Sequence, residues 1–321
     1  MALNYPRLDN ASGIWTMKEV ADAVKGGYWP NAAAGRMCIC GGDVTSPGPG
    51  TVDTIEYITM STAGNAADFG DLVGGSLNQF CGSGSFTRGV WPGTRSPGLV
   101  LDYITFATTG DAADFGDLTA NRKSGCSSNA TRGIFYAGVG VNVIDYIQIV
   151  SLGDATDFGD QTTARYYGAM GESPTRGVYG GGGSPGATNI IDYIEFASTG
   201  NAADFGDINT ATLGGMAGAS SSTRMVFGGG YTPTQLSQIE YVEIASTGNA
   251  IDYGDLSAAK SFITAESNSV RCIWAGGETP TQLNVIEFIA IPNGGNVTDF
   301  GDLTVATAGP AACSNQHGGL N

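Results

Sequence analysis

The residues with the clearest potential for chemistry are acidic and recur along the chain. Clustered carboxylates, with Asn201 or Asp111 nearby, could ligate a hard cation such as calcium, and a facing pair could hydrolyse a glycoside. The sequence Asp-(Phe/Tyr)-Gly-Asp occurs six times, with its first residue at Asp68, Asp114, Asp157, Asp204, Asp252 and Asp299. Because an enzyme needs one such site rather than six identical ones, the repetition favours a structural role.

Arginine recurs with the same period. One arginine opens an apolar segment in every repeat, at Arg36, Arg88, Arg132, Arg176, Arg224 and Arg271. In a hairpin with the strand that follows, each would lie near the aspartates of the repeated motif or near Glu56, Asp102, Asp145, Asp192, Glu240 or Glu287. Since one guanidinium group can bond several acceptors at once, we predict repeated Arg–carboxylate pairs within the repeats.

The sequence contains few other residues or motifs that are typical of catalysis. The chain has one histidine, His317, and no His-Glu-x-x-His sequence, so no set of nucleophile, base and acid is evident. Asp-Phe-Gly is also the magnesium-binding triplet of protein kinases, but the His-Arg-Asp loop of those enzymes is missing. We therefore predict a protein that is not an enzyme and has no cofactor, with His317 at the surface. A calcium site is the alternative, although the ligand spacing of an EF-hand is missing.

The repeats also define the secondary structure. Residues 191–207 run from β-branched and aromatic residues through Ser-Thr-Gly-Asn to Asp-Phe-Gly-Asp, which predicts a hairpin with a tight turn and a short return strand. Successive motifs are 43 to 48 residues apart, the period of four-stranded propeller blades. Each repeat would contain a first strand, such as 166–170 or 213–219, a second that opens on arginine, a third, and the return strand.

The two ends of the array complement each other. The first repeat begins at its second strand, residues 36–42, whereas residues 307–314 follow the last return strand and align with the first strands. We therefore predict that the C-terminal segment completes the first blade, because ring closure protects the edges of the sheets. The expected fold is an all-β, six-bladed β-propeller over residues 36–321.

Glycines after the second strand, with an aromatic residue in the third and another in the fourth, resemble a degenerate kelch repeat. The glycines occur at Gly41-Gly42, Gly180 to Gly183, Gly228 to Gly230 and Gly276-Gly277, whereas Trp91-Pro92-Gly93 and Gly138-Val139-Gly140 depart from the pattern. The resemblance covers most of the chain and implies the same six-bladed fold.

Residues 1–35 contain no copy of the repeat. Thr16 and Glu19 form a candidate capping box, residues 17–25 can form a short helix, and two glycines would end it. Large apolar groups around so short a helix need a surface to cover them. We predict an N-terminal helical arm that packs on the propeller or binds another chain through Trp15, Tyr28 and Trp29.

The whole pattern, with Gly13-Ile14-Trp15-Thr16 and Tyr28-Trp29-Pro30 ahead of the repeats, is similar to predicted structural proteins of tailed bacteriophages, especially marine and cyanobacterial ones. The resemblance implies a non-enzymatic virion component, tail-fibre-like or capsid-associated, that assembles in the host cytoplasm in multiple copies. Its implied partners are other virion proteins and a host-surface glycan or receptor.

An alternative function is that of a carbohydrate-binding or carbohydrate-cleaving propeller that acts on a host surface. Aromatic side chains in loops stack on sugar rings, and the candidates are Trp91, Tyr136, Tyr231 and Trp274. Trp274 falls in a predicted strand and is also a candidate core residue.

Composition argues against further classes of function. A net charge of -16 and a pI near 4.2 leave no basic footprint for nucleic acid. No apolar run is long enough to span a bilayer, and the first residues lack the features of a signal peptide, which indicates folding in a cytoplasm. The six cysteines include no Cys-x-x-Cys pair and are predicted to be reduced and buried.

Overall fold

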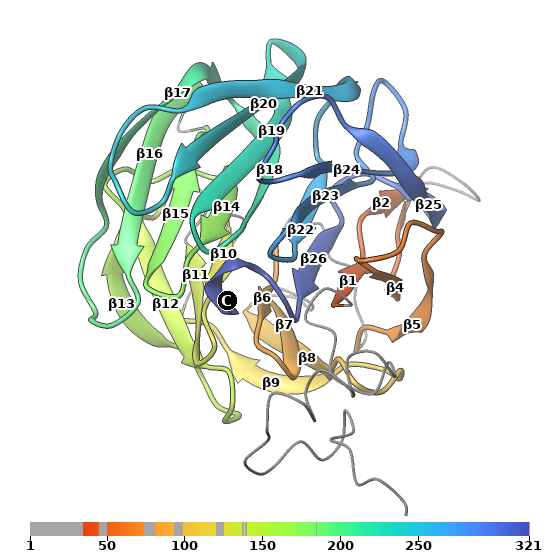
Figure 1. Cartoon of the computed structure of the whole chain (residues 1–321). Helices are drawn as coiled ribbons and strands as arrows, with labels where there is room; N and C mark the ends of the chain where they lie inside the picture. The colour runs from red at the N-terminus through yellow and green to blue at the C-terminus, as the bar shows by residue number, and fades with distance from the viewer. Residues whose placement is uncertain are drawn as a thin grey trace, which may run out of the picture.

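The chain forms an all-β, six-bladed propeller in the computed structural model (Figure 1). The structure describes residues 35–44, 50–73, 81–92, 99–119, 125–136, 138, 140–183 and 185–320. Each blade is an antiparallel sheet of four strands, so the predicted fold class is confirmed. Among the described residues the single helical element is the short 3-10 helix η1 (Gly318–Leu320). The predicted helical arm, up to residue 34, lies outside the described residues.

The first three blades are made of short strands. In each blade below, the strands are given in order from the propeller axis outward. The first blade contains β26 (Ala311–Ser314), β1 (Arg36–Cys40), β4 (Thr54–Thr59) and β5 (Ala67–Asp71). The second contains β6 (Ser83–Gly84), β7 (Arg88–Pro92), β8 (Val100–Thr105) and β9 (Ala113–Asp117). The third contains β10 (Cys126–Ser128), β11 (Arg132–Tyr136), β12 (Val143–Gln148) and β13 (Thr156–Asp160).

Strands are longer in the other three blades. The fourth blade contains β14 (Ala169–Glu172), β15 (Arg176–Gly180), β16 (Thr188–Glu195) and β17 (Ala203–Thr212). The fifth contains β18 (Gly214–Ser220), β19 (Arg224–Thr232), β20 (Thr234–Glu243) and β21 (Ile251–Lys260). The sixth contains β22 (Thr264–Ser267), β23 (Arg271–Ala275), β24 (Leu283–Ala290) and β25 (Thr298–Thr307). A small hairpin of β2 (Asp43–Val44) and β3 (Gly50–Thr51) extends the first blade's loop.

The first blade is built from segments far apart in the sequence. β26 pairs with β1, with Cys38 opposite Cys313. The backbone N–H of Gly35 also donates to Gln316 Oε1 at 3.0 Å. The prediction that the C-terminal segment completes the first blade is therefore confirmed. The strand is shorter than predicted, because Thr307 still belongs to β25 and the next three residues make the turn.

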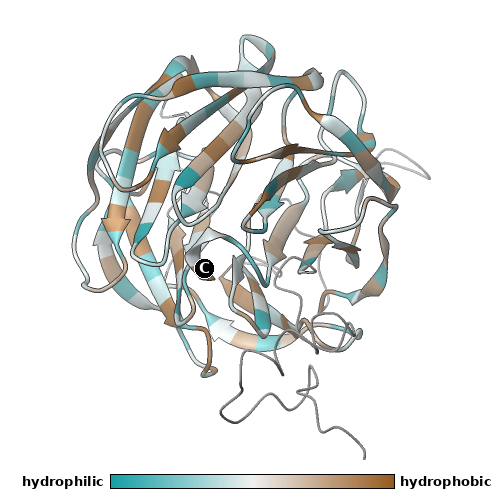
Figure 2. Cartoon of the chain, viewed as in Figure 1, coloured by the Kyte–Doolittle hydropathy of each residue, from teal (hydrophilic) through white to brown (hydrophobic). Residues whose placement is uncertain are grey.

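Apolar side chains are buried between neighbouring blades. Along the strands, apolar positions alternate with polar ones, as Figure 2 shows in brown and teal. The phenylalanine of the repeated motif is one of the buried groups, as in Phe69 and Phe205, which are each 2% exposed, whereas Tyr253 at the equivalent position is partly buried. The Phe69 ring packs edge to face against Tyr57 of the same blade, with 6.0 Å between centroids. The motif therefore contributes to the core.

The segment after each third strand bonds to the outer strand of the preceding blade. At the joint that closes the ring, Gly64 N donates to Phe300 O and Ala66 N to Asp302 O, both at 2.8 Å. Equivalent pairs of hydrogen bonds join the other five pairs of blades. Asn65 Oδ1 also accepts Asp302 N at 3.1 Å, as do its equivalents Asp111, Asp154, Asn201, Asn249 and Asn296 in their own joints. The predicted turn sequence thus covers a sheet edge.

The glycine of the repeated motif is required by this joint. Gly301 has a φ of 154°, and a Cβ added there would overlap with the carbonyl group of Gly64. The same overlap with the following blade would occur at Gly70, Gly116, Gly159, Gly206 and Gly254. Asp-Phe-Gly-Asp is therefore a sequence for burying an aromatic ring and docking a neighbouring backbone.

Candidate functional site

The six repeated arginines also bond neighbouring blades. Each guanidinium Cζ lies 4.6 to 5.1 Å from the centroid of the third-strand aromatic ring of its own blade. Its Nη1 donates to a carbonyl of the next blade, as Arg176 does to Ile244 O at 3.1 Å. The equivalent bonds join Arg36 to Phe106, Arg88 to Ile149, Arg132 to Phe196, Arg224 to Pro292 and Arg271 to Met60.

This arrangement differs from the predicted Arg–carboxylate pairs. The register places Arg176 opposite Glu195, whereas the expected partner Asp192 lies three positions away along the strand. Arg176 Nε is 2.7 Å from Glu195 Oε1, and an equivalent pair in the fifth blade is 2.6 Å apart. Both pairs are partly exposed, so each contributes at most about 1 kcal/mol. The stacked ring and the carbonyl of the next blade are the shared partners of all six arginines.

Replacing Arg271 with methionine is expected to lower the free energy of unfolding by about 1–3 kcal/mol. The substitution removes a cation stacked on Phe288 and the hydrogen bond to Met60 O, which joins the sixth blade to the first. Urea unfolding of both proteins measures the loss. Arg271→Lys keeps the charge and is expected to retain part of the stability, and equal stability of all three proteins would contradict this role.

The predicted acidic residues do come together, in pairs across neighbouring strands. Each third-strand carboxylate is buried and lies opposite the first aspartate of the motif, in the pairs Glu56–Asp68, Asp102–Asp114, Asp145–Asp157, Asp192–Asp204, Glu240–Asp252 and Glu287–Asp299. Two of these carboxylates have buried cationic partners. Arg165 Nη2 lies 2.8 Å from Asp192 Oδ2, and Lys260 Nζ lies 2.7 Å from Glu287 Oε1.

Arg165 and Lys260 could not be predicted from the repeat, because the recurring arginines stand at the start of the second strands. Both residues instead come after a motif, Arg165 beyond the end of β13 and Lys260 at the end of β21. Burial raises the pKa of Asp192, while Arg165 and Thr162 act to lower it. The Lys260–Glu287 pair joins the fifth blade to the sixth, and both pairs neutralise buried charge, which is a structural role.

A calcium site stays a prediction. Over the part of the chain that the structure describes, no group of three or more His, Cys, Asp or Glu side chains is placed to hold a metal ion. The candidate oxygen ligands Asn201 and Asp111 accept hydrogen bonds from the backbone of Asp160 and Asp71 at the blade joints.

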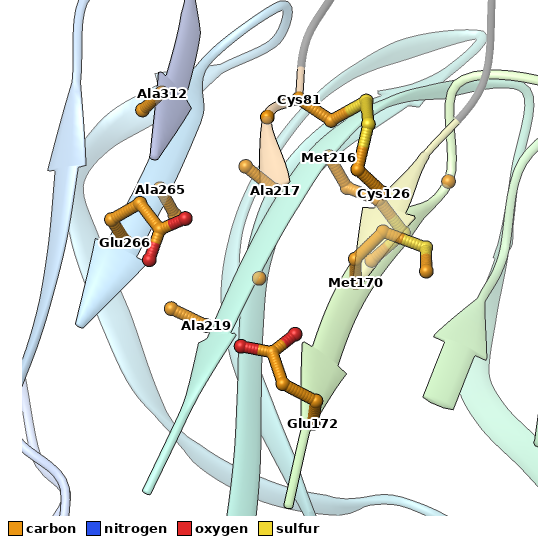
Figure 3. Close-up of a pocket in the computed structure, with 13 residues that line it drawn as sticks. Cys81, Cys126, Met170, Glu172, Met216, Ala217, Ala219, Ala265, Glu266 and Ala312 are labelled. Carbon is orange, nitrogen blue, oxygen red and sulfur yellow. A yellow bond between two sulfur atoms is a disulfide. The ribbon is translucent and has the colours of Figure 1, made fainter. Parts of the chain in front are cut away.

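The cysteines depart in part from the prediction. Cys81 and Cys126, which lie at the start of the second and third blades, form a disulfide with their Cα atoms 5.4 Å apart (Figure 3). The expectation that all six are reduced is therefore wrong for this pair. The free cysteines are buried as predicted, and burial raises the pKa of Cys38, Cys40, Cys272 and Cys313. Buried thiols with raised pKa values are unreactive.

The first strands of the six blades surround a narrow axial channel. Figure 3 shows Glu172 of β14 and Glu266 of β22 projecting into it, with the disulfide and Met170 farther along. The remaining cavity is about 30 Å3. That volume holds one or two water molecules.

The residues after β26 close one end of this channel, and we call residues 315–320 the plug. His317, expected at the surface, is 1% exposed, so that expectation is wrong. Its Nδ1 lies 2.8 Å from Glu172 Oε1, and its Nε2 lies 2.9 Å from Gly84 O and 3.3 Å from Ser128 Oγ. These three partners belong to β14, β6 and β10. One imidazole therefore ties together three blades.

His317 of the plug and the nearby Glu266 shift each other's pKa values. Burial lowers the pKa of His317, but the carboxylates of Glu172 and Glu266 and the hydrogen bonds of the ring raise it more, to about 9. Burial raises the pKa of Glu266 to about 8, although His317 opposes the rise. At neutral pH the histidine is therefore charged beside Glu172.

The opposite end of the channel is bordered by residues of positive φ, which we call the collar. Tyr167, Phe262 and Gly309 come just before the first strands of the fourth, sixth and first blades, with φ of 60°, 54° and 68°, and Gly215 is the second residue of the fifth blade's first strand, with φ of 72°. The N–H groups of Gly215, Phe262 and Gly309 donate to the carbonyl of the preceding member at 3.0, 2.7 and 2.7 Å. The collar thus fixes the backbone at this end.

A pocket of about 270 Å3, which we call the mouth pocket, opens at the collar. Two of its walls are the rings of Tyr167 and Phe262, which meet edge to face with 6.3 Å between centroids. Among the described residues, the lining comprises Tyr167, Phe262, Asp43, Glu278, Gln282, Ala308 and Gly309. Aromatic faces beside a few polar groups are typical of a small-molecule site.

Rigid backbone supports the polar side of the mouth pocket. Asp43 and Ala308 exchange backbone hydrogen bonds of 2.8 and 3.0 Å, and Glu278 and Ser261 exchange bonds of 2.9 and 3.2 Å. Glu278 also forms a bridge with Gln282 across its own loop. Hydrogen bonds from different parts of the ring therefore fix the backbone of both acidic residues.

The aromatic residues predicted to stack on sugars are mostly in the core. Trp91, Tyr136 and Trp274 are at most 1% exposed, which excludes them as surface contacts. Tyr231 is the exception, with 38% exposure. The two rings of the mouth pocket were not predicted. The sequence does contain a signal for them, because Tyr167 aligns with Gly215 of the next repeat and Phe262 aligns with Gly309.

The predicted partner-binding residues Trp15, Tyr28 and Trp29 lie outside the described residues. In the part of the chain that is described, no helix has the length and apolar character needed to cross a membrane.

The fold defines the chain as a six-bladed β-propeller with four-stranded blades. No protein-family model matches the sequence, and neither does any curated protein. The kelch-like and phage-like resemblances therefore depend on the sequence patterns alone.

Proposed function

We propose that the protein is a non-enzymatic structural component of a bacteriophage virion. In this proposal the propeller is attached to the particle through its N-terminal arm and presents loops to a partner protein or to the host surface. The observation that best supports this proposal is the difference between the two ends of the channel. Gly35, where the preceding residues join the propeller, lies beside the plug, whereas the collar and the mouth pocket lie at the other end.

The use of the repeated residues supports a scaffold rather than an enzyme. The arginines stack on aromatic rings and bond the next blade, and the motif glycines admit the neighbouring backbone. A ring closed by so many joints is a rigid support on which loops can be varied. The similarity of the repeats to tail-fibre-like phage proteins points in the same direction.

A second candidate is a propeller that binds, or cleaves, carbohydrate on a host surface. The mouth pocket favours binding, because it combines two aromatic rings with two carboxylates and an amide. The two candidates are compatible if a virion protein uses this pocket to recognise the host.

Deleting residues 1–30 is expected to abolish incorporation into particles while leaving the propeller folded. The expected physical reason is that the arm supplies the apolar contact with the particle, whereas the described ring is closed without it. Mass spectrometry of purified particles measures incorporation, and thermal unfolding of the isolated protein measures folding.

The matched control is Tyr167→Gly, which alters the opposite end of the channel and is expected to enter particles normally. Normal incorporation of the deleted chain would overturn the assignment. Locating the protein in intact particles by electron microscopy distinguishes a position on the tail from one on the capsid.

A further inference from the structure

Tyr167 and Phe262 occupy backbone positions that suit glycine. Their φ values of 60° and 54° lie in the left-handed region, which strains the backbone of an aromatic residue. Glycine occupies the equivalent collar positions Gly215 and Gly309, where the same backbone hydrogen bonds are made. The collar therefore does not need aromatic side chains. Both exceptions line the mouth pocket, which suggests that their rings are retained for what the pocket binds.

The polar groups of the mouth pocket give it a negative potential. Burial and the nearby charge of Asp43 raise the pKa of Glu278, and burial raises the pKa of Asp43. The pKa of Tyr167 is also raised, by burial and by its neighbours Tyr166 and Asp43. Bringing a positive charge into this space would favour the ionised form of both carboxylates.

A positive charge could come from a metal ion or from an organic cation. Calcium prefers six to eight oxygen ligands, whereas the described lining offers two carboxylates and one amide beside two aromatic rings. Aromatic faces attract ammonium groups through their quadrupole, and a neutral sugar would gain no such attraction. At about 270 Å3 the pocket is slightly smaller than sites for drug-sized ligands, so it suits one small headgroup.

We infer that the mouth pocket binds an organic ammonium group, such as that of an amine-bearing sugar, between the rings of Tyr167 and Phe262 and the carboxylates of Asp43 and Glu278. The inference rests on the second candidate function, ligand binding at the surface, and gives the chemistry of the ligand. It is independent of the arm, so a failure here leaves the particle-incorporation result unaffected.

Titration calorimetry with two matched pairs of probes tests the charge. Choline is compared with its neutral isostere, in which carbon replaces nitrogen, and glucosamine is compared with glucose. The cationic member of at least one pair is expected to bind at millimolar or lower concentration, and its neutral counterpart at least about tenfold more weakly. Equal binding of glucose and glucosamine would overturn the inference in favour of a neutral sugar, and binding of calcium alone would overturn it in favour of a metal site.

Single substitutions locate the binding. Asp43→Asn and Glu278→Gln remove charge with little change of shape, and each is expected to weaken the better cationic probe about tenfold or more. Tyr167→Gly and Phe262→Gly are expected to abolish binding while leaving the melting temperature unchanged or higher, because glycine suits the collar conformation.

The matched control is Phe86→Ala, which removes a 55% exposed ring from the hairpin between β6 and β7. This variant is expected to bind the probe like the unaltered protein. Unchanged affinity in the four pocket variants, or no binding of either cationic probe, would overturn the inference.

Discussion

Replacing His317 with alanine is expected to lower the free energy of unfolding by about 3–5 kcal/mol, the usual cost of breaking a buried ion pair. The change leaves Glu172 without its cation in the closed end of the channel and removes the hydrogen bonds to Gly84 and Ser128. Guanidinium unfolding monitored by tryptophan fluorescence measures the loss.

The double variant Glu172→Gln with His317→Gln is the control. It removes both charges together and is expected to be more stable than His317→Ala, because no buried charge is left unpaired. A single variant as stable as the unaltered protein would show that the plug does not hold the blades together.

The shifted pKa values of His317 and Glu266 make the stability of the protein depend on pH. The pKa of His317 is raised from 6.5 to about 9 in the folded protein, so its stabilising contribution is fully present below pH 6.5 and is lost as pH rises through 9. The pKa of Glu266 is raised from 4.5 to about 8, so the folded state is progressively destabilised as pH rises between these values. Both effects lower stability toward alkaline pH. The stability difference between the protein and His317→Ala is expected to shrink as pH rises through about 9.

Gly301→Ala is expected to lower the free energy of unfolding by about 2–5 kcal/mol, the combined cost of a strained backbone and of an overfilled contact. The new methyl group would overlap with the carbonyl of Gly64, at the joint where the sixth blade docks on the first. The hydrogen bond between Gly64 N and Phe300 O would lengthen or break. Thermal and urea unfolding both report the change.

Gly64→Ala is a control from the other side of the same joint. A Cβ added to Gly64 meets nothing within 4 Å, so this variant is expected to differ from the unaltered protein by no more than about 0.5 kcal/mol. Equal losses in the two variants would mean that general backbone effects, and not the docking of the blades, determine the result.

The architecture could be predicted because it repeats. The spacing of the motif gave the number of blades and their strands, and the missing first strand of the opening repeat matched the extra segment before Ser314. Strand ends were less accurate: the first strand predicted at 166–170 is observed at Ala169–Glu172, because Tyr167 belongs to the collar.

The contacts between blades could not be predicted in the same way. The repeat shows that Arg176 has a constant role, but its acceptor, Ile244 O, belongs to another blade, and a repeat pattern does not give the register between separate sheets. In the sequence, His317 is flanked by glycine and polar residues, a pattern that predicts a loop at the surface. Its burial depends on Glu172, from a strand that the local sequence does not identify.

Closure of the first blade by β26 has a consequence for how the protein is made. Arg36 and its bonding partner Asn315 are 279 residues apart in the sequence, so at about 5–20 residues per second the ribosome needs roughly 14–56 s to make the second after the first. Until then the inner edge of β1 is unpaired and can recruit a wrong strand. A chain shortened before Ala311 would keep that open edge and also lack the plug. Closure of the ring therefore requires that translation has reached β26.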